Sequence, residues 1–282
     1  MARYKTFEFR SRGVRLNARK WWPDKGYPRS VVVCVHSWGD HSGRFTELAE
    51  QLTLHGYAVY AFDFEGHGES EGDRARIHDF DDMVADLTIF VGVVHNELRS
   101  VPLFLCAYAI GGMVAVDYLT TRHDVDGAIF AACALAEGKA VPPLKRLFAW
   151  VVGGLLPWLP VARITFGHQM SRDPVQVRAW EEDPLIWHGK MTAGAAKQMM
   201  VGLQKISKKL ELVDLPLLVL HGSADPLVDP VSGMALEKRS PSIDKRLINY
   251  DGAYHDLFHD SHREQVFADV RAWLDGHAAK GW

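Results

Sequence analysis

Several features that define specialised classes of protein are scarce in this sequence of 282 residues. The formal net charge is only −3, and nucleic-acid binding usually needs a concentrated basic surface, so we expect no nucleic-acid partner. There are only three cysteines, and Cys34 and Cys106 lie in apolar runs, which favours free, reduced thiols in the core over disulfides. No apolar signal segment follows Met1, so we predict a cytoplasmic location.

Long uninterrupted apolar runs are absent as well. The segment Leu147 to Ala162 is apolar, but it is shorter than the roughly 20 residues that a membrane span needs. It is also broken by Gly153, Gly154, Pro157 and Pro160. Two interpretations remain for this segment, a lid helix buried against the protein or a surface that touches a membrane transiently.

What the sequence does contain is a regular alternation of short apolar runs with helix-like segments, which is typical of parallel βαβ units. The expected core strands are 31–35, 57–62, 101–107, 127–132, 215–220 and 245–250. The expected helices are 43–55, 79–98, 111–120, 231–238 and 262–274. An antiparallel hairpin over 5–10 and 14–22, turning at Arg12-Gly13, is expected at one edge of the sheet.

The alternation stops after Ala136 and resumes near residue 211. The stretch between, rich in tryptophan and proline, is interpreted as an inserted cap. The predicted fold class is therefore α/β, with a mostly parallel central sheet, helices on both faces and a cap subdomain. We expect a core over 1–136 and 206–282 and a cap over 137–205.

The segment from Phe104 to Gly112 runs from a strand into a helix through small residues, which is the context of a nucleophile elbow. The central residue of such a turn is held in a strained backbone conformation, and Ala107 and Gly111 provide the small neighbours that it needs. The central residue is Ala109, which occupies the nucleophile position without an attacking oxygen.

An acid and a base follow two later strands. Asp225 lies just past the strand expected at 215–220, and His255 lies past the strand expected at 245–250. The carboxyl ends of parallel strands meet at one edge of the sheet, so both side chains are expected near residue 109. With a serine at that position, His255 would accept the hydroxyl proton, and Asp225 would orient the imidazole and stabilise its charged form.

Two loops complete the set of candidate residues. Backbone N–H groups of Trp38, after the first core strand, and of Ile110, after the elbow, are expected to form an oxyanion hole. The segment from Asp63 to Ser70 contains three acids and a histidine, but glycines on both sides of His67 favour a tight turn over a metal site. We therefore predict no metal, and we predict no cofactor.

Together these motifs resemble those of monoacylglycerol lipases and their relatives, α/β-hydrolases of the serine aminopeptidase S33 and lysophospholipase type. The matching segments are His36 to Phe45, Asp63 to Gly72, the elbow, Asp183 to Leu185, His221 to Asp225 and Gly252 to His255. The resemblance implies a nucleophile position at 109, the acid Asp225, the base His255, oxyanion donors at Trp38 and Ile110, and a lid over an apolar acyl pocket. The family usually has glycine where Ser37 and Ala107 stand, and histidine where Tyr108 stands.

The predicted function is hydrolysis of a small carboxylic ester with an apolar arm through an acyl-enzyme, because the cap is apolar and pockets of this kind are mostly apolar. Candidate substrate contacts are Ser37, Tyr108, Trp150, Trp158 and Trp180. We interpret Ala109 as a deliberate Ser-to-Ala substitution that inactivates an otherwise intact site. The alternative is a non-catalytic ligand-binding homologue with a natural alanine. The identity of the ester and the oligomeric state stay open.

Overall fold

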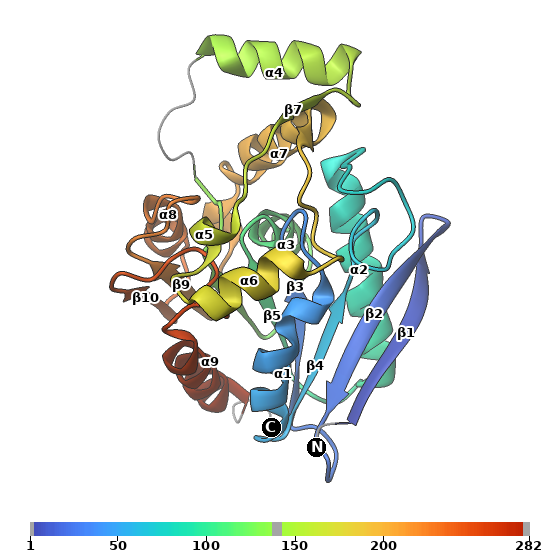
Figure 1. Ribbon diagram of the computed structural model, residues 1–282. Coiled ribbons are helices and arrows are strands. Elements are labelled where there is room, and N and C mark those ends of the chain that lie inside the picture. Colours follow the sequence, from blue (N-terminus) through green and yellow to red (C-terminus); the bar gives the residue numbers. More distant parts are fainter. Residues whose placement is uncertain (1–2, 137–142, 279–282) are drawn as a thin grey trace.

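The computed structural model describes residues 3–136 and 143–278, and it has an eight-stranded sheet at its centre (Figure 1). The strand order is β1-β2-β4-β3-β5-β6-β9-β10, and the six strands from β4 to β10 in that order are all parallel. The predicted fold class is confirmed. The strands are β1 (Arg3–Ser11), β2 (Val14–Trp22), β3 (Ser30–Val35), β4 (Tyr57–Phe62), β5 (Leu103–Tyr108), β6 (Gly127–Ala131), β9 (Leu217–Gly222) and β10 (Lys245–Tyr250).

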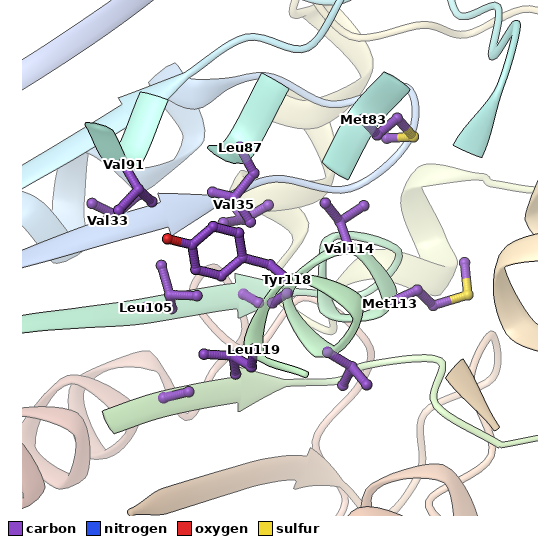
Figure 2. Close-up of a cluster of buried hydrophobic side chains, with 14 of the residues drawn as sticks. Val33, Val35, Met83, Leu87, Val91, Leu105, Met113, Val114, Tyr118 and Leu119 are labelled. Atoms are coloured by element: carbon purple, nitrogen blue, oxygen red, sulfur yellow. The ribbon is translucent and has the colours of Figure 1, made fainter. Parts of the chain in front are cut away.

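Helices cover both faces of the sheet, because alternate residues of each buried strand point to opposite sides. On one face Val33 and Val35 of β3 and Leu105 of β5 pack with α2 and α3, as Figure 2 shows. On the other face Val32 packs in a second cluster with residues of α1 and α9. The core helices are α1 (Thr46–Thr53), α2 (Phe80–Glu97), α3 (Gly111–Leu119), α8 (Val231–Arg239) and α9 (Arg263–Ala278).

The hairpin at the edge of the sheet forms as predicted. Strands β1 and β2 are antiparallel, with Ser11 opposite Val14, and β2 also pairs with β4. The two turn residues, Arg12 and Gly13, have φ angles of 51° and 87°. A two-residue turn with both φ angles positive matches the twist of the strands that it joins.

Several predicted boundaries differ from the structure, by one to four residues. The strand expected at 215–220 is β9, which begins at Leu217 and continues to Gly222, because Pro216 has no N–H group to donate within the sheet. The helix expected from residue 43 begins as a short 3-10 turn, Ser42–Phe45, before α1. All three cysteines are free and buried, as predicted.

In Figure 1 part of the segment between β6 and β9 lies above the upper ends of the strands, and the rest lies lower, in front of them. Residues 137–142 lie outside the described part of the chain, so the predicted boundary at 137 lies there too. The described elements are α4 (Pro143–Leu155), β7 (Pro160–Ala162), α5 (Gly167–Met170), α6 (Pro174–Glu182), β8 (Met191–Thr192) and α7 (Ala193–Ile206). Among the described helices, none has the length and apolar character needed to cross a bilayer.

Candidate active site

The turn between β5 and α3 has the geometry of a nucleophile elbow. Ala109 has a φ angle of 48°, in the left-handed region that side chains other than glycine rarely adopt. A Cβ atom on Gly111 would lie 2.5 Å from the carbonyl oxygen of Val35 and 2.6 Å from that of His36. Residue 111 must therefore be glycine for the elbow to pack this closely against the end of β3.

The acid and the base that the sequence predicts lie together. Asp225 follows β9 and His255 follows β10, and the Nδ1 atom of His255 is 2.8 Å from Oδ2 of Asp225. The other carboxylate oxygen, Oδ1, accepts hydrogen bonds from the N–H groups of Leu227 at 2.8 Å and Val228 at 3.0 Å. This pairing orients the imidazole and leaves its Nε2 atom available for proton transfer.

A second histidine contacts the same carboxylate. Nε2 of His221, a fully buried residue of β9, is 3.2 Å from Oδ2 of Asp225. Burial favours the neutral acid, but the charge of His255 and the hydrogen bonds from both histidines outweigh it, and they hold the pKa of Asp225 below its ordinary value. His221 was part of a motif that we recognised in the sequence, yet its spacing gave no sign of this contact.

Tyr108 lies beside the base and is buried. Its ring centroid is 5.3 Å from that of His255 and 6.2 Å from that of Phe258. Its hydroxyl group has no hydrogen-bond partner among the described residues, and burial raises the pKa of the phenol well above its usual value. The contact places His255 next to the elbow, while the ring itself packs in the core.

The expected oxyanion loop follows β3, and His36 fixes its first peptide group. The N–H of Phe64 donates to Nε2 of His36 at 3.0 Å, so Nδ1 carries the proton and donates to the carbonyl oxygen of Ser37 at 2.6 Å. Burial, together with the nearby His67, lowers the pKa of His36 to about 3, which keeps the ring neutral. The histidine therefore braces this loop.

The orientation of that peptide group determines where the Trp38 amide points. The carbonyl oxygen of Ser37 also accepts from the N–H of Asp40 at 3.3 Å. In a trans peptide the N–H points away from the C=O, so the Trp38 N–H is directed to the opposite side. No hydrogen bond within residues 3–136 and 143–278 uses this N–H. Across the site, the N–H of Ile110 donates to Oγ of Ser37 at 3.4 Å.

The three candidate tryptophans of the insertion occupy different surroundings. Trp150 and Trp158 are 54% and 58% exposed, and the ammonium group of Lys197 lies 4.9 Å from the Trp150 ring. Trp180 is 4% exposed and packs edge-on against His188. Trp180 belongs to the same buried hydrophobic cluster as Tyr108 and Ala109 of the elbow, and the roles of all three tryptophans in substrate binding stay predictions.

A different tryptophan connects the insertion to the site. The backbone N–H of Trp187 donates to the carbonyl oxygen of Gly39 at 2.8 Å. Close by, Oδ2 of Asp183 lies 3.0 Å from Nε2 of His41. In the sequence Trp187 is only one of several tryptophans of the insertion. Backbone contacts of this kind leave no signal in the side-chain pattern.

The acidic turn after β4 is held together by hydrogen bonds to Asp63. Asp63 accepts hydrogen bonds from the backbone and hydroxyl groups of Ser42, from the N–H of Glu69 and from the side chain of Asn17. Its oxygens are thereby occupied by protein donors. The described residues contain no group of three or more side chains arranged to hold a metal ion.

Comparison with known proteins agrees with this architecture. The family model described as serine aminopeptidase, S33, matches residues 26–262. A monoacylglycerol lipase of Mycolicibacterium smegmatis is 32% identical over 94% of this chain and 94% of its own length. The monoglyceride lipase of Rattus norvegicus is 31% identical over 92% of this chain and 87% of its own. The crystal structure of the Paleococcus ferrophilus monoacylglycerol lipase superposes with a TM-score of 0.80 at 28% identity, covering 98% of this chain and 99% of that one.

The sheet topology and these relatives define the molecule as an α/β-hydrolase. More narrowly, the chain belongs to the serine aminopeptidase S33 family, and its relatives include monoacylglycerol lipases.

Proposed function

We propose that this protein is a carboxylic-ester hydrolase of the monoacylglycerol lipase type in which alanine at position 109 replaces the nucleophilic serine. The observation that supports the proposal best is the conjunction of a strained elbow at Ala109 with a hydrogen-bonded pair of Asp225 and His255. The names of the related lipases support a substrate with an acyl arm.

The proposed reaction needs a hydroxyl at position 109. Its oxygen attacks the ester carbonyl carbon, its proton passes to Nε2 of His255, and the π electrons of the C=O bond move to the oxygen. When this tetrahedral intermediate collapses, the C–O bond to the alcohol breaks and the alcohol oxygen takes the proton from His255. Water then attacks the acyl-enzyme in the same way, which releases the carboxylic acid and restores the serine.

The side chains around this reaction have separate roles in the proposal. Asp225 fixes the tautomer of His255 and stabilises the imidazolium that forms after proton transfer. The N–H groups of Trp38 and Ile110 donate to the negative oxygen of the intermediate. With Ala109 the attacking oxygen is missing, so the chain binds its ester with little or no turnover.

The test is to replace Ala109 with serine and to measure hydrolysis of p-nitrophenyl esters and monoacylglycerols. We expect the rate to rise at least ~10⁴-fold over that of the parent chain, because loss of a triad nucleophile has a comparable effect. Adding His255→Ala or Asp225→Asn to Ala109→Ser should remove most of that gain.

Ala132→Ser is a matched control for this test. Ala132 has a φ angle of 50°, is buried like Ala109, and follows the neighbouring strand β6. A hydroxyl at this second strained alanine should produce no hydrolysis. A folded Ala109→Ser variant that is inactive across the whole panel of esters would show that the proposal is wrong.

Because Ala109 carries no hydroxyl group, one alternative is a binding protein that kept the substrate pocket and lost the catalytic activity. This alternative predicts that the natural gene encodes alanine at position 109 and that a small apolar ligand binds tightly without turnover. Reading that codon in the natural gene distinguishes the two functions directly.

The cap assignment also stays a proposal. We propose that residues 137–205 form a lid that shapes the acyl pocket and that its exposed apolar side chains, including Trp150 and Trp158, touch membrane surfaces transiently. The contacts of Trp187 and Asp183 with the loop after β3 support a lid that reaches the site.

A further inference from the structure

We infer that the hydroxyl group of Ser37 is a third hydrogen-bond donor of the oxyanion hole, beside the backbone N–H groups of Trp38 and Ile110. The inference rests on the proposed ester hydrolysis, because the negative oxygen forms only when a nucleophile adds to the carbonyl carbon. It gives Ser37 a role in the chemical step, in place of the general substrate contact predicted from the sequence.

The position of the hydroxyl is the first observation. The Ile110 N–H, at the N-terminus of α3, donates to Oγ of Ser37 at 3.4 Å. Oγ therefore lies on the side of the elbow toward which this N–H points. An ester oxygen that accepts a hydrogen bond from Ile110 must come close to the Ser37 hydroxyl as well.

The free proton of the hydroxyl is the second observation. A serine hydroxyl has one proton to donate and two lone pairs that accept. In this structure a lone pair of Oγ is used by Ile110, whereas no hydrogen bond among the described residues uses the proton. Ser37 is partly exposed, so the hydroxyl can turn toward a ligand.

These observations indicate an exchange of hydrogen bonds during the reaction. Before addition, the Ser37 oxygen holds the Ile110 N–H in place. When charge develops on the ester oxygen, that oxygen becomes the stronger acceptor, because hydrogen bonds to an ionised group are roughly twice as strong as neutral ones. Ile110 then donates to the negative oxygen, and the Ser37 hydroxyl rotates to donate its own proton to the same atom.

The backbone that carries Ser37 is held from several sides, as an oxyanion donor requires. The indole Nε1–H of Trp38 donates to the carbonyl oxygen of Ala75 at 2.8 Å. On the side that faces the insertion, the N–H of Trp187 donates to the carbonyl oxygen of Gly39 at 2.8 Å. With His36 bound to the Ser37 carbonyl, rotation of the serine side chain is the main freedom left at this position.

The kinetic test uses the Ala109→Ser background and compares Ser37→Ala with Ser37→Thr. Loss of the hydroxyl should lower kcat by about 10- to 100-fold, because single oxyanion donors have effects of this order or larger. KM should change less than about twofold, since the bond is made to the transition state. Threonine keeps the hydroxyl and should restore most of kcat. If Ser37→Ala matches or exceeds its Ala109→Ser parent in kcat, the donor role is wrong.

A binding test is independent of turnover and uses the chain with Ala109. Dodecylphosphonate presents tetrahedral anionic oxygens, whereas 1-O-dodecylglycerol is an uncharged ether with the same apolar arm. Ser37→Ala should weaken binding of the phosphonate about tenfold and leave binding of the ether unchanged. An equal loss for both ligands, or no loss for either, would contradict the inference.

The two tests separate this inference from the proposed function. If Ala109→Ser is inactive while Ser37→Ala still weakens binding of the phosphonate, the proposed hydrolysis is wrong and the anion-binding role of Ser37 stands. If Ala109→Ser is active and Ser37→Ala changes neither kcat nor phosphonate binding, the proposed hydrolysis stands and the role of Ser37 is wrong.

Discussion

Replacing Gly111 with alanine places a methyl group against the end of β3. The added Cβ would lie 2.5 Å from the carbonyl oxygen of Val35 and 2.6 Å from that of His36. A comfortable C···O contact is about 3.3 Å or longer, so the strand and the helix must separate by roughly 0.7 Å. Both obstacles are backbone atoms, and neither can move aside by a simple side-chain rotation.

The cost follows from the known effect of overpacking, which is about 1–3 kcal/mol and occasionally more. The better helix propensity of alanine offsets little of it, because Gly111 is the first residue of α3. We therefore expect Gly111→Ala to lower the free energy of unfolding by about 2–3 kcal/mol. For a protein of this size the Tm should fall by about 3–5 °C.

Gly92→Ala in α2 is the matched control, since a Cβ at that glycine meets no atom within 4 Å. This variant should gain about 0.5–1 kcal/mol, because alanine is the better residue inside a helix. Urea unfolding followed by tryptophan fluorescence measures both changes. In the Ala109→Ser background, Gly111→Ala should also reduce kcat, because it pushes the elbow away from the oxyanion loop. If Gly111→Ala is as stable as the parent, the elbow does not pack against the end of β3 as closely as these distances indicate.

Two further predictions concern the inserted segment. Burial opposes ionisation of Asp183, but hydrogen bonding to His41 outweighs it and lowers the pKa to about 2, below the ordinary 3.8. The resulting stabilisation, roughly 1 kcal/mol after solvent screening, is complete above about pH 4 and is lost as the pH falls toward 2. The stability difference between the parent and Asp183→Asn should therefore shrink across that range in urea titrations, and a constant difference would contradict this assignment. In liposome co-sedimentation, the double variant Trp150→Ser/Trp158→Ser should bind at least about tenfold more weakly than the parent. Ile243→Ser, which removes an exposed apolar residue before β10, should bind like the parent, and unchanged binding of the tryptophan variant would exclude membrane contact through these residues.

The central sheet could be predicted from the sequence because its parallel strands are buried on both faces. Runs such as Val31 to Val35 are continuously apolar, and the helices between them separate the strands clearly. The elbow could be located because its small residues stand between a strand and a helix. The acid and the base followed from their order along the chain, since both come directly after parallel strands.

The contacts that refine the site could not be predicted in the same way. Oγ of Ser37 meets the Ile110 N–H across 73 residues of sequence, and the Trp187 N–H meets Gly39 from the inserted segment. Each contact involves a backbone group, which the side-chain pattern does not encode. The surroundings of the tryptophans in the insertion were equally inaccessible, because Trp150 and Trp180 have the same residue type and opposite exposure.

The backbone at position 109 bears on which interpretation of the alanine is favoured. A residue other than glycine in the left-handed region costs about 1–3 kcal/mol, and such strain persists where the surrounding structure imposes it. Ala109 adopts a φ angle of 48°, whereas a glycine there would relieve the strain without adding a side chain. A protein selected only to bind a ligand has no need for a Cβ in this conformation. A serine nucleophile does need it, because the Cβ carries the attacking oxygen. Ala75 and Ala132 adopt similar φ angles without such a role, so the strain counts only together with the intact pair of Asp225 and His255. That combination favours a serine hydrolase that lost one oxygen over a binding protein that kept only the pocket.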